Sequence, residues 1–152
     1  MAYIEAPTCE AQAKENPFLK IPNEPDEKKA LLIHKGPHSF IVMNKFPYNA
    51  GHLLAVPYRE VPRLEELSAD ERADLMETIV KAQDILTKAL APHGFNVGFN
   101  FGKAAGAGIP THLHCHIVPR WEGDSNFMPV IAGTRCLPDA LDTMWERLRK
   151  FV

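Results

Sequence analysis

Three of the seven histidines lie within five residues, in the segment HLHCHIV at residues 112–118. Side chains at positions i, i+2 and i+4 of a strand point to one face, so a strand would place His112, His114 and His116 side by side. In a helix, His114 would face away from the other two. The apolar residues between the histidines, and a proline on each side of the segment, favour the strand.

Three imidazoles on one face are unusual, because they cannot all be buried without partners or all be charged without repulsion. A solvated strand face is one interpretation. A second is a zinc centre with three histidine ligands and an open fourth position, for which Glu122 and Asp124 are the nearest carboxylates that could orient the rings. A third is nucleophilic catalysis, in which a neutral imidazole attacks phosphorus and its neighbours stabilise charge.

The elements that must position these histidines can be predicted from periodicity. Ser68 and Glu71 form a capping box at the start of a long helix, whose apolar residues recur every three or four positions up to Leu90. Residues 95–101 alternate apolar and polar, which predicts a half-buried strand with four apolar residues facing the core. The remaining expected elements are strands at 31–33, 38–44, 52–57 and 112–118, and a helix from Pro138. Strands joined by short turns, together with helices, predict an α+β domain.

Composition limits the class of protein. The chain has 152 residues, 17 Lys and Arg against 19 Asp and Glu, and a formal net charge of −2. This length predicts one domain at 31–152, preceded by an extended or partly disordered arm at 1–30 that contains four prolines. The charge balance excludes a strongly basic, sequence-independent nucleic-acid binder. Three cysteines without framework spacing indicate a reducing, cytoplasmic compartment, and no apolar run is long enough to predict a membrane span.

The segment at 112–118 resembles the His-φ-His-φ-His-φ-φ motif of the histidine-triad superfamily, where φ is apolar. The resemblance extends over roughly residues 30–150, through FPYNAGHLLAVP at 46–57, the AAGAG loop, and IVPRW at 117–121. Asn44 precedes His52 by eight positions, as the ribose-contacting residue of the family does. The chain is most similar to the prokaryotic branch associated with diadenosine-tetraphosphate phosphorylase or hydrolase activity. This implies a sheet of about five antiparallel strands, one long helix and a C-terminal helix.

The resemblance implies a mechanism. His114, the middle histidine, would be the nucleophile that attacks the α-phosphorus of a nucleotide and forms a nucleotidyl-histidine intermediate. Its other ring nitrogen would be held by the main-chain carbonyl of His112. Water, or inorganic phosphate in a phosphorylase, would then release the nucleoside phosphate. A non-catalytic nucleotide-binding module with the same fold is the alternative.

Further residues take roles by the same resemblance. His116 and His52 would contact phosphate oxygens, with their protonated forms offsetting negative charge, and Asn44 would bind the ribose. The expected phosphate-binding positions are Asn100, in the strand at 95–101, and Gly106, Gly108 and Ile109, in the loop that follows it. The segment of Gly108, Ile109 and Pro110 replaces the Gln and Ser or Thr that many relatives use for the leaving group.

The family also suggests cofactors and assembly. Relatives often carry a Cys-x-x-Cys zinc motif near the N-terminus, but Cys9 has no second cysteine at that spacing, so no metal site is expected. No cofactor is expected either, although a nucleotide substrate can carry Mg²⁺. A homodimer, no nucleic acid and no membrane are the expected associations.

Overall fold

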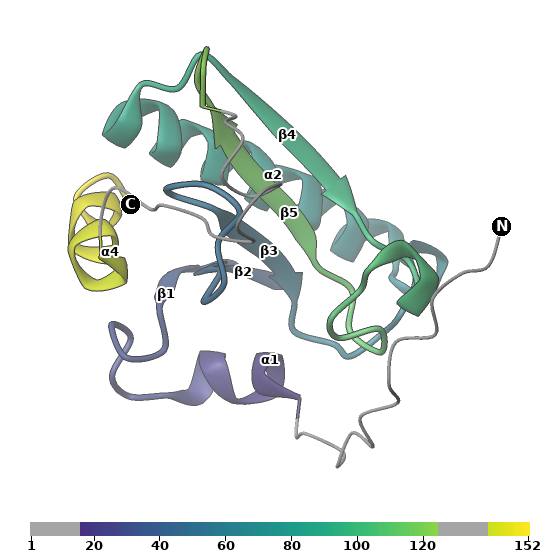
Figure 1. The fold of residues 1–152 in the computed structure, drawn as a ribbon. Coiled ribbons are helices and arrows are strands. Elements are labelled where there is room, and N and C mark those ends of the chain that lie inside the picture. The colour runs from purple at the N-terminus through teal and green to yellow at the C-terminus, as the bar shows by residue number, and fades with distance from the viewer. Residues whose placement is uncertain (1–15, 125–139) are drawn as a thin grey trace, which may run out of the picture.

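The computed structural model describes residues 16–124 and 140–152, and within these ranges five strands form one antiparallel sheet (Figure 1). The order across the sheet is β1 (Leu32–Lys35), β2 (Ser39–Met43), β3 (Leu53–Pro57), β5 (Cys115–Arg120) and β4 (Gly94–Phe99). The predicted α+β class and the five-stranded antiparallel sheet are confirmed. The 3₁₀ turns η2 (Leu64–Glu66) and η3 (Lys103–Ala105) lie in the connections.

The long helix α2 (Ala69–Leu90) covers one face of the sheet (Figure 1). Its predicted capping box is present: the Ser68 hydroxyl accepts from the Glu71 amide at 3.1 Å, and the Glu71 carboxylate accepts from the Ser68 amide at 2.7 Å. The shorter helix α4 (Leu141–Arg149) adds the buried residues Met144 and Leu148 to the same core. Pro138, expected to begin the C-terminal helix, lies outside the described residues.

The opposite face of the sheet carries a smaller apolar cluster and a short N-terminal helix. Helix α1 (Pro17–Lys20) and the turn η1 (Ile21–Asn23) lie where the sequence predicts an extended arm. Asn16 caps α1 through its side chain, and Phe18, 5% exposed, packs into the cluster. Residues 16–30 therefore differ from the expectation, because a capped turn and one buried aromatic side chain fix them to the sheet. Residues 1–15 lie outside the described part of the chain.

Two strands differ in detail from the predicted pattern. β5 begins at Cys115, so His112 and His114 lie in the turn before it rather than in the strand. In and after β4, Val97 and Phe101 are 45% and 47% exposed instead of facing the core. β4 is an edge strand, and α2 packs mainly over β2, β3 and β5. Within the described ranges, none of the helices has the length and apolar character needed to cross a membrane.

Gly51, next to His52, supplies a prediction about stability. Its φ is +75°, and an added Cβ would lie 2.5 Å from a methyl carbon of Leu90. The left-handed conformation and the overpacking together lead us to expect that Gly51→Ala lowers the free energy of unfolding by about 2–4 kcal/mol in urea titrations. Gly94→Ala is the matched control, because no atom lies within 4 Å of the added carbon. Equal effects of the two substitutions would contradict this view of Gly51.

Candidate active site

His114 is held by the main chain of the residue two positions before it. Nδ1 of His114 lies 2.8 Å from the carbonyl oxygen of His112. A carbonyl only accepts, so Nδ1 carries the proton and Nε2 keeps its lone pair. This is the hydrogen bond that the family resemblance implies. It leaves His114, only 7% exposed, in one tautomer, in which Nε2 carries the lone pair.

His112 does not face solvent beside the other two histidines, as it would on one face of a strand. Its ring is buried, and both of its nitrogens are hydrogen-bonded. Nε2 lies 2.8 Å from the carbonyl oxygen of Pro57, and Nδ1 lies 2.9 Å from the side-chain nitrogen of Asn16. Burial lowers the pKa of His112 below its ordinary value. His112 is therefore a neutral, fully bonded residue at the base of the site, and its carbonyl acts on His114.

His52 and His116 form a directional pair. The main-chain N–H of Tyr48 donates to Nδ1 of His52 at 3.0 Å, so the proton of neutral His52 lies on Nε2. That nitrogen is 3.0 Å from Nδ1 of His116, which must accept. The proton of neutral His116 therefore lies on Nε2, and the ring also stacks on Tyr48 with centroids 5.4 Å apart.

Nε2 of His116 stands out in the described part of the chain as a buried side-chain nitrogen without a hydrogen-bond partner. Leaving a buried donor unsatisfied costs about 1–3 kcal/mol, so such a group in a native protein points to a ligand atom. Burial, with a smaller contribution from His114, lowers the pKa of His116 to about 4. At neutral pH His116 therefore offers an N–H donor rather than the positive charge that the resemblance implies.

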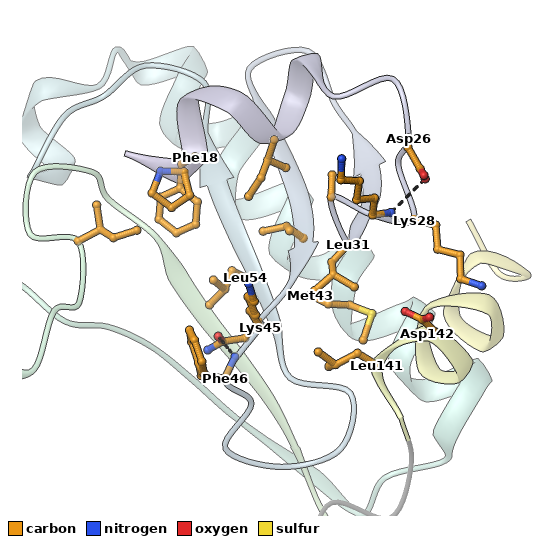
Figure 2. Close-up of a pocket in the computed structure, with 17 residues that line it drawn as sticks. Phe18, Asp26, Lys28, Leu31, Met43, Lys45, Phe46, Leu54, Leu141 and Asp142 are labelled. Carbon is orange, nitrogen blue, oxygen red and sulfur yellow. Dashed lines mark hydrogen bonds between the residues drawn. The ribbon is translucent and has the colours of Figure 1, made fainter. Parts of the chain in front are cut away.

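A cavity of about 870 Å³ is lined by residues of α1, β2 and β3 and of the loops beside them (Figure 2). Phe18 lines the cavity, and its ring centroid lies 5.3 Å from that of His112 and 5.2 Å from that of His114. Its apolar walls come from the strands, α1 and the loop before the triad: Phe18, Ile21, Leu31, Val42, Leu54 and Ile109. The cavity therefore has an apolar interior, and one of its wall residues, Phe18, contacts His112 and His114.

Asn44 lies at the polar edge of this cavity, beside His52. Its side-chain oxygen accepts from the Phe46 amide at 2.9 Å, and its Nδ2 lies 3.4 Å from Nδ1 of His52. The side chains of Asn44 and His52 are therefore close together in the structure, although the two residues are eight positions apart in the sequence. Lys45, Asp26 and Lys28 add charged groups to the lining of the cavity (Figure 2).

The predicted phosphate-binding residues do not all line one cavity. Asn100 lines a smaller cavity of about 260 Å³ together with Tyr48 and His116. Ile109 lines the larger cavity, whereas Gly106 and Gly108 line neither of these two. A Cβ on Gly106 would be 4.0 Å from the side-chain nitrogen of Asn100, so the loop approaches the smaller cavity without entering it.

Sequence reasoning missed three residues that contact the histidines: Asn16, Phe18 and Tyr48. An Asn followed by Pro is a helix-start pattern, and it could have placed Asn16 as the cap of a short helix. Tyr48 lies within the loop that carries the family resemblance, but no local pattern indicates that its ring stacks on His116. These contacts join residues that are far apart in the chain.

The arrangement of the rings does not favour the zinc interpretation. Both nitrogens of His112 are engaged by protein groups, and His52 and His116 bond to each other. Within residues 16–124 and 140–152, no group of three or more His, Cys, Asp or Glu side chains could hold a metal ion. The carboxylate of Asp124 accepts hydrogen bonds from Arg120 and Asn49.

The low pKa of His116 predicts how stability responds to acid. The pKa of His116 has its ordinary value of 6.5 in the unfolded chain, whereas in the folded protein it is lowered to about 4. The free energy of unfolding therefore falls as the pH is lowered from 6.5 towards 4, and the lowered pKa of His112 acts in the same direction. Urea titrations of His116→Gln across this window should show a shallower slope than those of the wild type. A His116→Gln slope equal to that of the wild type would contradict the assignment.

Comparison with known proteins identifies a matching family. The family model described as HIT domain matches residues 25–123. A protein of Mycobacterium tuberculosis named AP-4-A phosphorylase is 46% identical over 125 residues, which are 82% of this chain and 64% of that protein. The chain thus spans somewhat less than two thirds of the length of that relative.

Two further proteins extend the comparison. The bis(5'-nucleosyl)-tetraphosphatase [asymmetrical] of Schizosaccharomyces pombe is 38% identical over 82 residues, 54% of this chain and 44% of that protein. The crystal structure of a hypothetical histidine triad nucleotide-binding protein from Sulfolobus tokodaii superposes with a TM-score of 0.70 at 22% identity, covering 89% of this chain and 90% of that one. At this identity the superposition establishes the fold alone.

Proposed function

The chain belongs to the HIT family, and from this premise we propose that it is a nucleotidyl hydrolase or transferase that cleaves dinucleoside polyphosphates, such as diadenosine tetraphosphate, or related nucleotide conjugates. The reaction breaks the bond between the α-phosphorus and its bridging oxygen through a nucleotidyl-histidine intermediate on His114. The observation that carries the proposal is the 2.8 Å hydrogen bond from Nδ1 of His114 to the His112 carbonyl, which leaves Nε2 free to attack. The names of the mycobacterial and yeast relatives support this class of substrate.

The first step exchanges one bond at phosphorus for another. The Nε2 lone pair of His114 forms a bond to the α-phosphorus, and the remaining polyphosphate leaves with the electron pair of the broken P–O bond. The imidazole then carries a positive charge, which the carbonyl of His112 stabilises through the proton on Nδ1. In the second step, the oxygen of water or inorganic phosphate forms a bond to the same phosphorus, and the P–N bond breaks so that His114 leaves as a neutral imidazole. When water is the attacking group, its proton is lost to the solvent.

His116 stabilises the charge that develops on the non-bridging oxygens. Its Nε2–H is buried and unpartnered, so a phosphate oxygen can accept from it without displacing a protein bond. His52 fixes this direction by donating to Nδ1 of His116. A donor held in place before the reaction lowers the barrier because no rearrangement is needed when charge appears.

The large cavity is the proposed nucleoside site. Its volume of about 870 Å³ lies within the usual range of small-molecule sites, and the neighbouring strand residues Val42 and Leu54 can pack against one face of a base. Asn44 lies at its polar edge and is the proposed ribose contact. Asn100 and the loop with Gly106, Gly108 and Ile109 are the proposed phosphate contacts. No resident cofactor takes part in these steps, and Mg²⁺ enters only as a companion of the substrate.

The edge strand β4 supports a proposed homodimer. Val97 is 45% exposed, and β4 has a neighbour on one side within the described part of the sheet. An uncovered edge strand with apolar side chains is a typical place for a second copy to extend a sheet. Light scattering coupled to size exclusion decides between a monomer and a dimer.

Product analysis tests the proposed function. Diadenosine tetraphosphate is incubated with the protein in the presence and absence of inorganic phosphate, and the nucleotides are separated by chromatography. ADP that appears only with phosphate identifies a phosphorylase, and AMP plus ATP without phosphate identifies a hydrolase. AMP binding without any product, including with adenylylated conjugates as substrates, would show a non-catalytic nucleotide-binding module and overturn the proposal.

A further inference from the structure

The side chain of Asn16 lies at the centre of a hydrogen-bond network beneath the triad. Its oxygen accepts from the Phe18 amide at 3.0 Å. Its nitrogen lies 2.9 Å from Nδ1 of His112 and 2.9 Å from a carboxylate oxygen of Glu60. Thr111, which precedes His112, donates to the same carboxylate oxygen at 2.8 Å. The amide of Asn16 therefore links three parts of the site: the start of α1 at Phe18, the ring of His112 and the carboxylate of Glu60.

These contacts settle which way the amide of Asn16 points and which proton His112 carries. The oxygen must face the Phe18 amide, because that amide only donates, so the nitrogen faces Glu60 and His112. An amide nitrogen only donates, so Nδ1 of His112 accepts and the proton of His112 lies on Nε2. That proton is donated to the carbonyl of Pro57 at 2.8 Å.

We propose that Asn16 is a positioning residue for the nucleophile: it holds His112 as the neutral Nε2–H tautomer in one orientation, and thereby the carbonyl that fixes Nδ1 of His114. This inference rests on the proposed role of His114. Asn16 precedes the residues that match the HIT family model, 25–123, so that match assigns it no role. The ring of His112 is fastened to residue 16 at one nitrogen and to residue 57 at the other, and its own carbonyl lies 2.8 Å from His114.

The neutrality of His112 matters for the reaction. When His114 attacks phosphorus it becomes cationic, and its neighbours at close range are His112 and His116. A positive charge on His112 would oppose that step by like-charge repulsion. An amide at position 16 donates to Nδ1 of His112 and so favours the neutral ring, whereas a carboxylate there would stabilise the protonated ring. Glu60 and His114 are the titratable groups with the largest electrostatic effect on His112, and Glu60 already has its own partners in Asn16 and Thr111.

Three substitutions separate this role from that of a helix cap. Asn16→Ser keeps an oxygen that can cap α1 but is too short to reach His112. Asn16→Asp also keeps the cap and replaces the donor to His112 with an acceptor. Asn23→Ala is the matched control, because Asn23 lies in the same segment and its side chain donates to the Leu19 carbonyl at 3.2 Å, away from His112.

The first measurement is nitrogen-15 NMR of the histidine rings, which reports the proton on each nitrogen without requiring turnover. In the wild type and in Asn23→Ala, His112 should carry its proton on Nε2 and His114 on Nδ1. Asn16→Asp should place protons on both nitrogens of His112 at neutral pH. Asn16→Ser should give a mixture of tautomers at His114. Wild-type patterns at His112 in Asn16→Asp, or at His114 in Asn16→Ser, would overturn the proposal whatever the activity of the protein.

The second measurement is steady-state kinetics with diadenosine tetraphosphate. Asn16→Ser should lower kcat by roughly tenfold to a hundredfold, because a displaced nucleophile loses its attack geometry, while KM changes by less than about threefold. Asn23→Ala should keep the wild-type kcat. A wild-type kcat in Asn16→Ser would overturn the positioning role. Absence of turnover in the wild type, with the NMR pattern as expected, would instead overturn the proposed function and leave the tautomer assignment supported.

Discussion

Replacing His114 with alanine abolishes turnover of diadenosine tetraphosphate, with a loss of at least about 10⁴-fold in kcat, because the attacking nitrogen is removed and no second route to the intermediate exists. Nδ1 of His114 is fixed by the His112 carbonyl, so Nε2 is the only nitrogen of this ring available for attack. The measurement is a steady-state assay at saturating substrate.

Two controls make this result specific. His38→Ala removes an exposed histidine outside the site and should retain wild-type turnover. AMP binding to His114→Ala, measured by calorimetry, should remain within about tenfold of the wild type, since the proposed base site is the apolar cavity rather than the nucleophile. Turnover by His114→Ala within tenfold of the wild type would contradict the assignment of the nucleophile.

The second large effect is expected at His116. Replacing it with alanine removes the buried Nε2–H donor that we assign to the phosphate oxygens, and kcat should fall by about 10²- to 10³-fold. The loss should appear in kcat more than in KM, because the donor acts most strongly when charge develops on the phosphate. Stopped assays at several substrate concentrations separate the two constants.

The partner of His116 provides an internal check. His52 donates to Nδ1 of His116, so His52→Ala leaves the donor in place but removes the bond that orients it. A smaller loss in kcat than for His116→Ala is expected. If His52→Ala is the more damaging of the two, the direction of the hydrogen bond between the two rings is wrong.

The parts of the fold that local patterns determine could be predicted from the sequence. Helix α2 was predicted because Ser68 and Glu71 cap it and its buried residues repeat at helical spacing. Val97 and Phe101 show where such reasoning fails: alternation identifies a strand, but it does not tell whether a helix covers that strand. β4 lies at the edge of the sheet, and this position depends on the order of all five strands.

The site shows the same division. The spacing of the histidines and their family resemblance identify His112, His114 and His116, but a strand row would have given all three the same environment. His112 and His114 lie in the turn before β5, where the His112 amide donates to the Ile109 carbonyl at 3.3 Å and the Leu113 amide to the Val61 carbonyl at 2.7 Å. This turn directs His112 towards Asn16 and Pro57. The contact of Asn16 with His112 could not be predicted from local patterns, because the two residues are 96 positions apart in the sequence.

The proposed reaction passes through a covalent intermediate on Nε2 of His114, and this intermediate can be trapped. The protein is mixed with diadenosine tetraphosphate without added phosphate, quenched during the first turnovers in alkaline denaturant, which preserves a phosphorus–nitrogen bond, and digested for mass spectrometry. We expect an adenylyl group on the peptide that contains His114, located on that residue by fragmentation and absent from His114→Ala. An adenylyl group on another residue, or full turnover by a His114→Ala protein that forms no adduct, would contradict it.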